Sequence, residues 1–346
     1  MKTTLRHIQQ MAEKFVHAQN LRQLGQLIRR PAHHIALLSS LKDYHVYEIP
    51  KPGGDMRLIE EPAPALKNIQ QAFNRYLQAV YFVHQTPPAY GYVIHPKNHK
   101  PAKNILTNAM QHMGHPYVLK VDLEDFFHQI HQKRVFGLFR SHPFRFEKQT
   151  ASVLSSLFTF RQRLPMGAPT SPVLSNFATI GLDHELHLWA MQQGITFTRF
   201  ADDMTFSAQF KIKDTHLQQI RAICQRHQYR LNEEKTAFLG PDDTKIITGL
   251  VVGRHEVDIE PAFYEDLRTG IERLKHLIEA GLLMHSAKEN ELIVKMKQQV
   301  RGMLNFLGMI KGYHSDVYTS YKQLFDQALH PGDDALFIRW NYFHYL

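Results

Sequence analysis

Apolar residues recur with the period of a helix near both ends of the chain. Residues 5–15 and 21–28 carry apolar side chains at spacings of three and four, which predicts two helices. The same spacing returns in the last third of the chain, over residues 267–278, 292–309 and 317–329. Both ends of the chain are therefore predicted to be helical.

The central part of the chain contains short runs of β-branched and aromatic residues, which are typical of strands. Residues 44–50 and 56–59 flank a glycine-rich turn and predict a hairpin. A further apolar run, residues 118–121, ends at an aspartate, and residues 195–200 and 204–207 flank another tight turn. Helices are predicted between these strands, over residues 65–80, 132–140, 147–160, 175–192 and 217–227. The mixture predicts an α+β fold.

The composition of the chain indicates what kind of partner the protein binds and in which cellular compartment it lies. Among 346 residues, 41 Lys and Arg outnumber 32 Asp and Glu, and the net charge of +9 favours a polyanionic partner such as nucleic acid. Cys224 is the single cysteine, so no internal disulfide can form, and its apolar neighbours favour a buried core thiol. We find no run of about 18 apolar residues. No membrane span is therefore expected, and we expect a cytoplasmic protein.

The candidate chemistry is concentrated at Phe200-Ala201-Asp202-Asp203, where two adjacent carboxylates lie at the tip of a predicted hairpin. Aspartates often simply form turns, but Asp122 adds a third carboxylate at the end of another strand. Like charges in one place are costly unless a cation shares them. Mg²⁺ prefers such oxygen ligands, and three strand-borne carboxylates suit two metals about 3.5–4 Å apart. Arg199, just before the turn, is expected to be a paired structural charge.

The order of these motifs resembles that of a reverse transcriptase, from about Tyr47 to Gly253. Two further stretches, Asn108-Ala109-x-x-His112 and Ile247-Thr248-Gly249-Leu250, resemble the bacterial retron branch of that family. The motifs that carry the wider resemblance are Asp122-x-x-x-Phe126-Phe127, Leu164-Pro165-Met166-Gly167-Ala168-Pro169, Phe200-Ala201-Asp202-Asp203 and Leu231-Asn232-x-x-Lys235-Thr236.

The resemblance implies a right-hand polymerase of the α+β class, with fingers, a palm built on an antiparallel sheet, and a helical thumb. The implied parts are N-terminal helices over residues 1–43, fingers over 44–115, a palm over 116–255 with a finger insertion at about 141–170, and a thumb over 256–346. In such an enzyme the thumb holds the template–product duplex mainly through its phosphates.

The resemblance also assigns the catalytic residues. Asp122, Asp202 and Asp203, with the backbone carbonyl of Leu123, would hold two Mg²⁺ ions. Lys235 would protonate or stabilise the leaving pyrophosphate, although an ordinary surface lysine is the competing interpretation.

Further residues would bind the incoming dNTP. Arg57 matches a position that grips the triphosphate, and Lys51 is a second candidate. Phe127 would crowd a ribose 2′-hydroxyl, although it could equally be a core residue. Gly167 would allow close approach to nucleotide and template, and Met166 replaces the glutamine that is common there.

Membership of the retron branch would imply a dedicated partner RNA. In retron enzymes the stretch that contains Asn108 and His112 is associated with recognition of that RNA; a hydrogen-bonded structural histidine is the other interpretation of His112. A structured noncoding RNA would serve as template and, through an internal guanosine 2′-hydroxyl, as primer. The branched RNA–DNA (msDNA) product would stay bound, and antiphage defence would need a separate effector protein.

Three alternatives remain open at this stage. The chain could be another bacterial defence reverse transcriptase, or a group II intron-like enzyme, although no maturase-like extension follows the predicted thumb. It could also be a non-catalytic RNA-binding scaffold with the same fold. The intact set of three carboxylates speaks against a scaffold.

Overall fold

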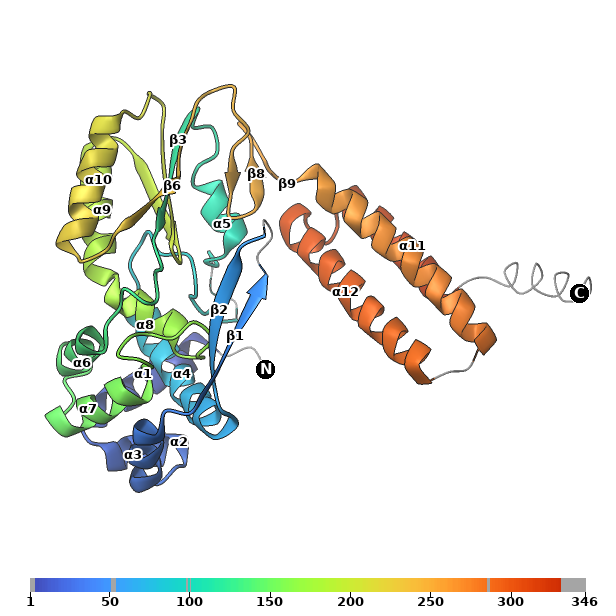
Figure 1. Ribbon diagram of the computed structural model, residues 1–346. Helices are drawn as coiled ribbons and strands as arrows, with labels where there is room; N and C mark the ends of the chain where they lie inside the picture. Colours follow the sequence, from blue (N-terminus) through green and yellow to red (C-terminus); the bar gives the residue numbers. More distant parts are fainter. Residues whose placement is uncertain (1–3, 51–53, 98, 100, 285–286, 331–346) are drawn as a thin grey trace, which may run out of the picture. The chain divides into compact units, whose positions relative to one another are not determined.

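The structure is a computed structural model that describes residues 4–50, 54–97, 99, 101–284 and 287–330 (Figure 1). Its internal contacts divide the chain into two compact units, Met1–Thr248 and Gly249–Leu346. The first unit mixes helices with sheet, and the second contains a short hairpin and helices. This is the predicted α+β class.

A four-stranded antiparallel sheet forms the centre of the first unit, in the order β4-β5-β3-β6. The two middle strands, β5 and β3, bury Leu119, Val121 and Phe206 almost completely, so the sheet is anchored by apolar burial. Helices α9 and α10 lie along one side of the sheet (Figure 1). The bounds are β3 Tyr117–Leu123, β4 Thr196–Phe200, β5 Asp203–Ala208, β6 Leu231–Leu239, α9 Ile180–Gln192 and α10 Asp214–Arg226.

A second, two-stranded sheet is the hairpin of β1 (Tyr44–Pro50) and β2 (Met56–Pro62), as predicted. It is paired from Tyr44 opposite Pro62 to Pro50 opposite Met56 without a shift of register. The chain then enters the long helix α4 (Pro64–His84), which begins with a proline where no backbone donor is needed.

Several of the remaining helices of the first unit pack against α4 in a core rich in aromatic side chains. Phe15 of α1 is fully buried and packs edge-on against Phe73, Phe144 and Phe146. Burying each such side chain contributes roughly 1.5–3 kcal/mol. The bounds are α1 Leu5–His17, α2 Leu21–Ile28, α3 Ala32–Leu41, α5 Ile105–Met110, α6 Gln132–Arg140, α7 Lys148–Leu157 and α8 Ser171–Ala178, with the short strand β7 at Ile246–Ile247.

In its described residues, the second unit contains an antiparallel hairpin and three helices, which confirms the helices predicted near the C-terminal end. Leu267, Leu274, Val300 and Leu307 are buried between the helices at helical spacing. Lys311 of α12 forms an ion pair with Asp258 of β9, with 3.0 Å between Nζ and Oδ2. The bounds are β8 Leu250–Val252, β9 Val257–Ile259, α11 Pro261–Met284, α12 Ala287–Lys311 and α13 Asp316–Leu329.

Two local predictions were wrong. The single helix predicted over residues 175–192 is broken at Thr179, whose hydroxyl donates to the carbonyls of Ser175 and Asn176 and so competes with the helical pattern. Strand β6 was not predicted, because its side chains are mostly polar and exposed, as an edge strand allows. No helix in the described part of the chain is both long and apolar enough to cross a bilayer.

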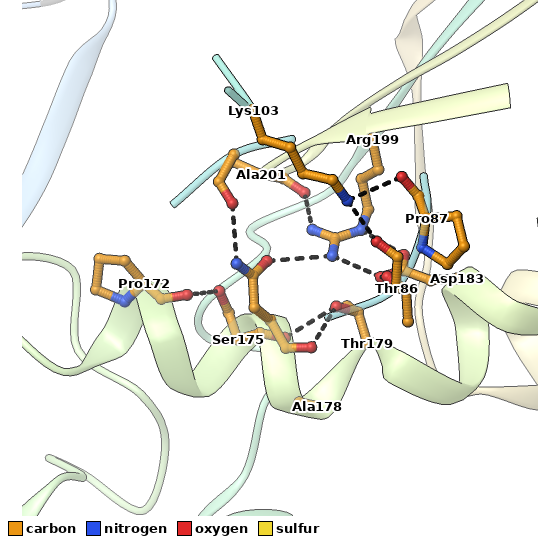
Figure 2. A network of polar contacts seen from close by, with 12 residues as sticks. Thr86, Pro87, Lys103, Pro172, Ser175, Ala178, Thr179, Asp183, Arg199 and Ala201 are labelled. Carbon is orange, nitrogen blue, oxygen red and sulfur yellow. Dashed lines mark hydrogen bonds and ion pairs between the residues drawn. The ribbon is translucent and has the colours of Figure 1, made fainter. Parts of the chain in front are cut away.

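Arg199 of β4 is the largest fully buried side chain among the described residues, and Figure 2 shows its polar contacts. Its Nε and Nη2 donate to the two carboxylate oxygens of Asp183 at 2.6 and 2.8 Å. Burial disfavours the cation, but the attraction of Asp183 outweighs burial and raises the pKa of Arg199. Thr86 donates to the same carboxylate at 2.8 Å. Arg199 is therefore a paired structural charge, as predicted.

The same guanidinium supports the turn that follows β4. Nη1 donates to the carbonyl of Ala201 at 2.8 Å, and Nη2 also donates to the side chain of Asn176 at 3.1 Å (Figure 2). Asn176 in turn donates to the carbonyl of Gly91 at 2.9 Å. Ala201 has a φ of 60°, a left-handed conformation that needs such local support in a residue with a side chain.

We expect the Asp183→Asn substitution to lower the free energy of unfolding by about 3–5 kcal/mol, because it leaves the buried Arg199 without a counter-charge. Denaturant unfolding of the intact protein measures this change. The control is Arg221→Gln, which breaks the exposed ion pair with Glu233 and should cost at most about 1 kcal/mol. Equal effects of the two substitutions would contradict the structural role of Arg199.

Candidate active site

Strand pairing brings the three predicted carboxylates together at one end of the central sheet. In the antiparallel register of β3 and β5, Asp122 lies directly opposite Asp203. Asp202 lies in the tight turn between β4 and β5, and its carbonyl accepts a hydrogen bond from the backbone N–H of Leu123 at 3.1 Å. Because this bond joins β3 to the turn, the position of each aspartate is fixed by backbone pairing.

The negative charges of the three aspartates lie close together, and this affects the pKa values of Asp202 and Asp203. Burial and the charges of Asp202 and Asp122 raise the pKa of Asp203 to about 6. Burial and the charge of Asp122 also raise the pKa of Asp202. Both carboxylates therefore resist ionisation in the protein alone, and a bound cation would relieve that resistance.

Lys235 of β6 already supplies one positive charge to the cluster. Its Nζ donates to Oδ1 of Asp122 at 3.0 Å, and β6 is the other neighbour of β3. Burial lowers the pKa of Lys235, but the hydrogen bond to Asp122 and the attraction of the other two aspartates outweigh burial, so the net shift is upward. The predicted catalytic lysine is thus in direct contact with a predicted metal ligand.

The donor atoms of the cluster suit a hard divalent cation, because all three side chains offer carboxylate oxygens. Among the residues that the structure describes, no three His, Cys, Asp or Glu side chains are already arranged as a metal site. Asp122 instead directs one oxygen to Lys235. The chemistry of the residues fits Mg²⁺, and a metal that binds Oδ1 of Asp122 would displace Lys235 from that oxygen.

The predicted triphosphate ligand Arg57 lies on β2 with an exposed side chain. Its positive charge partly opposes the rise in the pKa of Asp202, so Arg57 acts electrostatically on the carboxylate cluster. Lys51, the second candidate, lies outside the described residues. The structure therefore retains Arg57 as a candidate and provides no test of Lys51.

The paired phenylalanines after Asp122 have different environments. Phe126 is buried in the core, whereas Phe127 is only partly buried and lies 6.4 Å from the ring of Tyr92, centroid to centroid. A residue that meets a nucleotide sugar must be accessible, so the predicted gate remains with Phe127.

Gly167 packs closely against strand β2, at Glu60. A Cβ atom there would lie 3.0 Å from the carbonyl oxygen of Glu60, and its φ of 127° is unfavourable for residues with side chains. The carbonyl of the preceding Met166 accepts from the N–H of Glu60 at 2.6 Å. The predicted nucleotide loop is therefore fastened to β2, a contact that the sequence did not reveal.

Asn108 and His112, which were predicted to recognise RNA, both have buried side chains, and His112 fits the alternative interpretation of a hydrogen-bonded structural histidine. The RNA role of this stretch stays a prediction. Asn108 is 1% exposed and His112 is fully buried. The two ring nitrogens of His112 lie 2.7 Å from the hydroxyls of Ser207 and Thr198, on the two strands of the catalytic hairpin. Burial lowers the pKa of His112 to about 3. The motif therefore supports the sheet from within.

Comparison with known proteins places this geometry in context. Over residues 49–260 the sequence matches the family of reverse transcriptases (RNA-dependent DNA polymerases). It is 31% identical over 293 residues to the retron Ec86 reverse transcriptase of Escherichia coli, and 83% of each chain is covered. It is also 31% identical over 295 residues to the retron Mx162 reverse transcriptase of Myxococcus xanthus, covering 77% of this chain and 57% of that protein, so it spans little more than half of the latter.

Among solved structures, a telomerase from Candida albicans in complex with a fragment of telomeric RNA is similar at 10% identity and a TM-score of 0.43. The similarity covers 83% of this chain and 63% of that one.

The Asp203→Asn substitution should stabilise the metal-free protein. Like charges directly opposite each other on paired strands are destabilising, and relieving them is worth about 0.2–1 kcal/mol. Denaturant unfolding in the presence of EDTA measures the gain. Asp242→Asn is the control, because Asp242 is exposed on a loop away from the cluster. A loss of stability in Asp203→Asn would contradict the repulsion.

Stability should depend on pH through His112. Its pKa of about 3 in the folded protein is far below the usual value of about 6.5, so below pH 6.5 the unfolded chain binds the extra proton. Folding is therefore penalised as the pH falls, by a slope that approaches about 1.4 kcal/mol per pH unit. Between pH 7 and 5, the loss of stability per pH unit on acidification should be greater in the wild type than in His112→Gln by up to this amount, because the substitution leaves the opposing titration of Asp203 in place. Equal slopes would contradict a buried neutral histidine.

Proposed function

The chain belongs to the reverse transcriptase family, in its retron branch, and we propose from this premise that it copies a dedicated structured noncoding RNA into DNA. Family membership makes it an RNA-directed DNA polymerase, that is, a nucleotidyltransferase. Reverse transcriptases use divalent metal ions, and their templates include RNA.

One observation carries the proposed mechanism. Asp122 and Asp203 face each other across the pairing of β3 and β5, and Asp202 is held in the adjoining turn. In our proposal these three side chains and the carbonyl of Leu123 hold two Mg²⁺ ions. When bound, such ions activate the primer hydroxyl and stabilise the charge that develops on the phosphates.

The chain's own residues position the reactants and balance the charge. The primer hydroxyl attacks the α-phosphorus of the dNTP and loses its proton to water. The bond between the α-phosphorus and the oxygen that bridges to the β-phosphate breaks, and pyrophosphate leaves as the new phosphodiester forms. Lys235 supplies positive charge and a proton to the departing pyrophosphate. Its contact with Asp122 supports this role, because the ammonium group is already directed at the cluster.

The substrate residues are proposed on the same basis. Arg57 binds the triphosphate, since a guanidinium group matches phosphate oxygens, and Lys51 is the second candidate. Phe127 excludes a 2′-hydroxyl. Met166 and Gly167 lie against the nascent base pair. What supports these roles is the accessibility of Arg57 and Phe127 and the left-handed backbone of Gly167.

The retron assignment extends the proposal to the product. A guanosine 2′-hydroxyl within the partner RNA acts as the primer, and the DNA strand that results is joined to the RNA by a 2′ branch (msDNA). The RNA–DNA hybrid stays bound, and a separate effector protein uses it in defence against phage. The support for this part is the similarity to two named retron reverse transcriptases.

Purification of the protein from its native operon tests this function. Nuclease digestion of the bound nucleic acid should release a DNA strand of defined length that carries a 2′ branch to RNA. The Asp202→Asn variant should fold and bind RNA but contain none of this DNA. Glu124→Gln is the matched control, because Glu124 is an exposed carboxylate paired with Arg230, and it should retain the product.

The alternative outcomes are distinct. DNA synthesis without a branch would place the chain with other bacterial reverse transcriptases and reject the retron product. Bound RNA that is unchanged in Asp202→Asn, with no synthesis on any template, would reject the polymerase mechanism in favour of an RNA-binding scaffold.

A further inference from the structure

Glu60 is a fully buried carboxylate outside the catalytic cluster. It lies on β2, where its side chain is 0% exposed. Glutamate is almost never fully buried unless it is paired, because desolvation of the charge costs several kcal/mol. Glu60 therefore requires partners, and the mechanism described above does not use it.

The partners of Glu60 come from two segments that are remote in sequence. Nη2 of Arg163 lies 3.1 Å from Oε1, and Nε2 of His128 lies 3.1 Å from Oε2. Arg163 begins the loop that contains Met166 and Gly167, here called the Arg163–Gly167 loop. His128 follows the strand that carries Asp122. The other ring nitrogen of His128 lies 2.8 Å from Asp125. One buried carboxylate thus joins β2 to two segments next to the active site.

The backbone of Glu60 strengthens the same junction. Its N–H donates to the carbonyl of Met166 at 2.6 Å. Its carbonyl oxygen packs so closely against Gly167 that a Cβ atom on Gly167 would lie only 3.0 Å from it. Both the side chain and the main chain of one residue therefore hold the Arg163–Gly167 loop against β2.

The location of Glu60 links two proposed parts of the dNTP site. Residues three apart on a strand point to opposite faces, so Arg57 is directed away from the buried junction, and its side chain is exposed. Arg57 is the proposed triphosphate ligand, and Met166 and Gly167 are the proposed neighbours of the base pair. Their separation is set by the junction at Glu60.

We propose that Glu60 is a positioning residue that fixes the β2 hairpin on the Arg163–Gly167 loop and thereby sets the affinity for the incoming dNTP. The proposal rests on the substrate roles given above for Arg57, Met166 and Gly167. A buried ion pair suits this task, because it has directional partners on two segments, whereas an apolar side chain would allow the hairpin to slide.

Steady-state kinetics on a primed homopolymeric RNA template, with dTTP as substrate, test the proposal. Glu60→Gln should raise the KM for dTTP about tenfold, the factor expected when one hydrogen bond of a charged pair is lost, and should leave kcat within about twofold. Arg163→Gln should act in the same direction. The double variant should be less than additive, because both substitutions remove one interaction.

The neighbouring Glu61 provides a matched control. It is a glutamate on the same strand, but its side chain is partly exposed and pairs with Lys67 and Tyr47. Glu61→Gln should leave both KM and kcat at wild-type values. Thermal unfolding of each variant separates loss of folding from loss of positioning, and Arg163→Gln serves in place of Glu60→Gln if the latter does not fold.

Three results would overturn the proposal: a wild-type KM in both Glu60→Gln and Arg163→Gln, equal effects of Glu60→Gln and Glu61→Gln, or a fall in kcat with unchanged KM. This assay needs neither the branch nor the native RNA. Normal kinetics without a branched product would therefore contradict the proposed retron product alone, whereas an unchanged KM in active variants would contradict the role of Glu60 alone.

Discussion

The antiparallel pairing of β3 with β5 is the constraint on which the active site depends. It sets Asp122 opposite Asp203, in an arrangement that the carboxylates themselves oppose. Burial and this repulsion together raise the pKa of Asp203. Apolar burial in the two middle strands of the sheet offsets this cost, and the ammonium group of Lys235 reduces it further. In our proposal, metal cations balance the charge that remains at this site.

Buried charges, rather than apolar packing alone, hold the segments around this site. Behind the catalytic turn, Arg199 binds Asp183 and supports the left-handed Ala201. Beside the nucleotide loop, Glu60 binds Arg163 and His128. The partners of Glu60 lie 68 and 103 positions away in sequence, whereas Arg199 and Asp183 are 16 positions apart. Each buried carboxylate is satisfied by more than one partner. Such pairs add little stability over apolar residues of the same size, but they fix direction, which a polymerase site requires of its turn and loops.

Much of the site could be predicted from the sequence, because its elements are local. The strands around Asp122 and the Asp202 turn have clear β-branched and aromatic runs, and Phe200 to Asp203 forms a compact motif. What could not be predicted depends on long-range pairing. Glu60 resembles any charged strand residue until its partners, 68 and 103 positions away, are known. Asn108 and His112 are polar residues that suggest a surface, yet tertiary packing buries both, and His112 lies against hydroxyls of β4 and β5.

We propose above that Asp122, Asp202 and Asp203 form a metal site. The most direct test is to locate Mn²⁺ in crystals of the protein with a primed template and a dNTP. Anomalous scattering locates Mn²⁺ independently of any assumption about the ligands. We predict Mn²⁺ bound by Asp122, Asp202 and Asp203, with Nζ of Lys235 released from Asp122. An active protein whose Mn²⁺ lies elsewhere, while Lys235 remains on Asp122, would contradict this account of the active site.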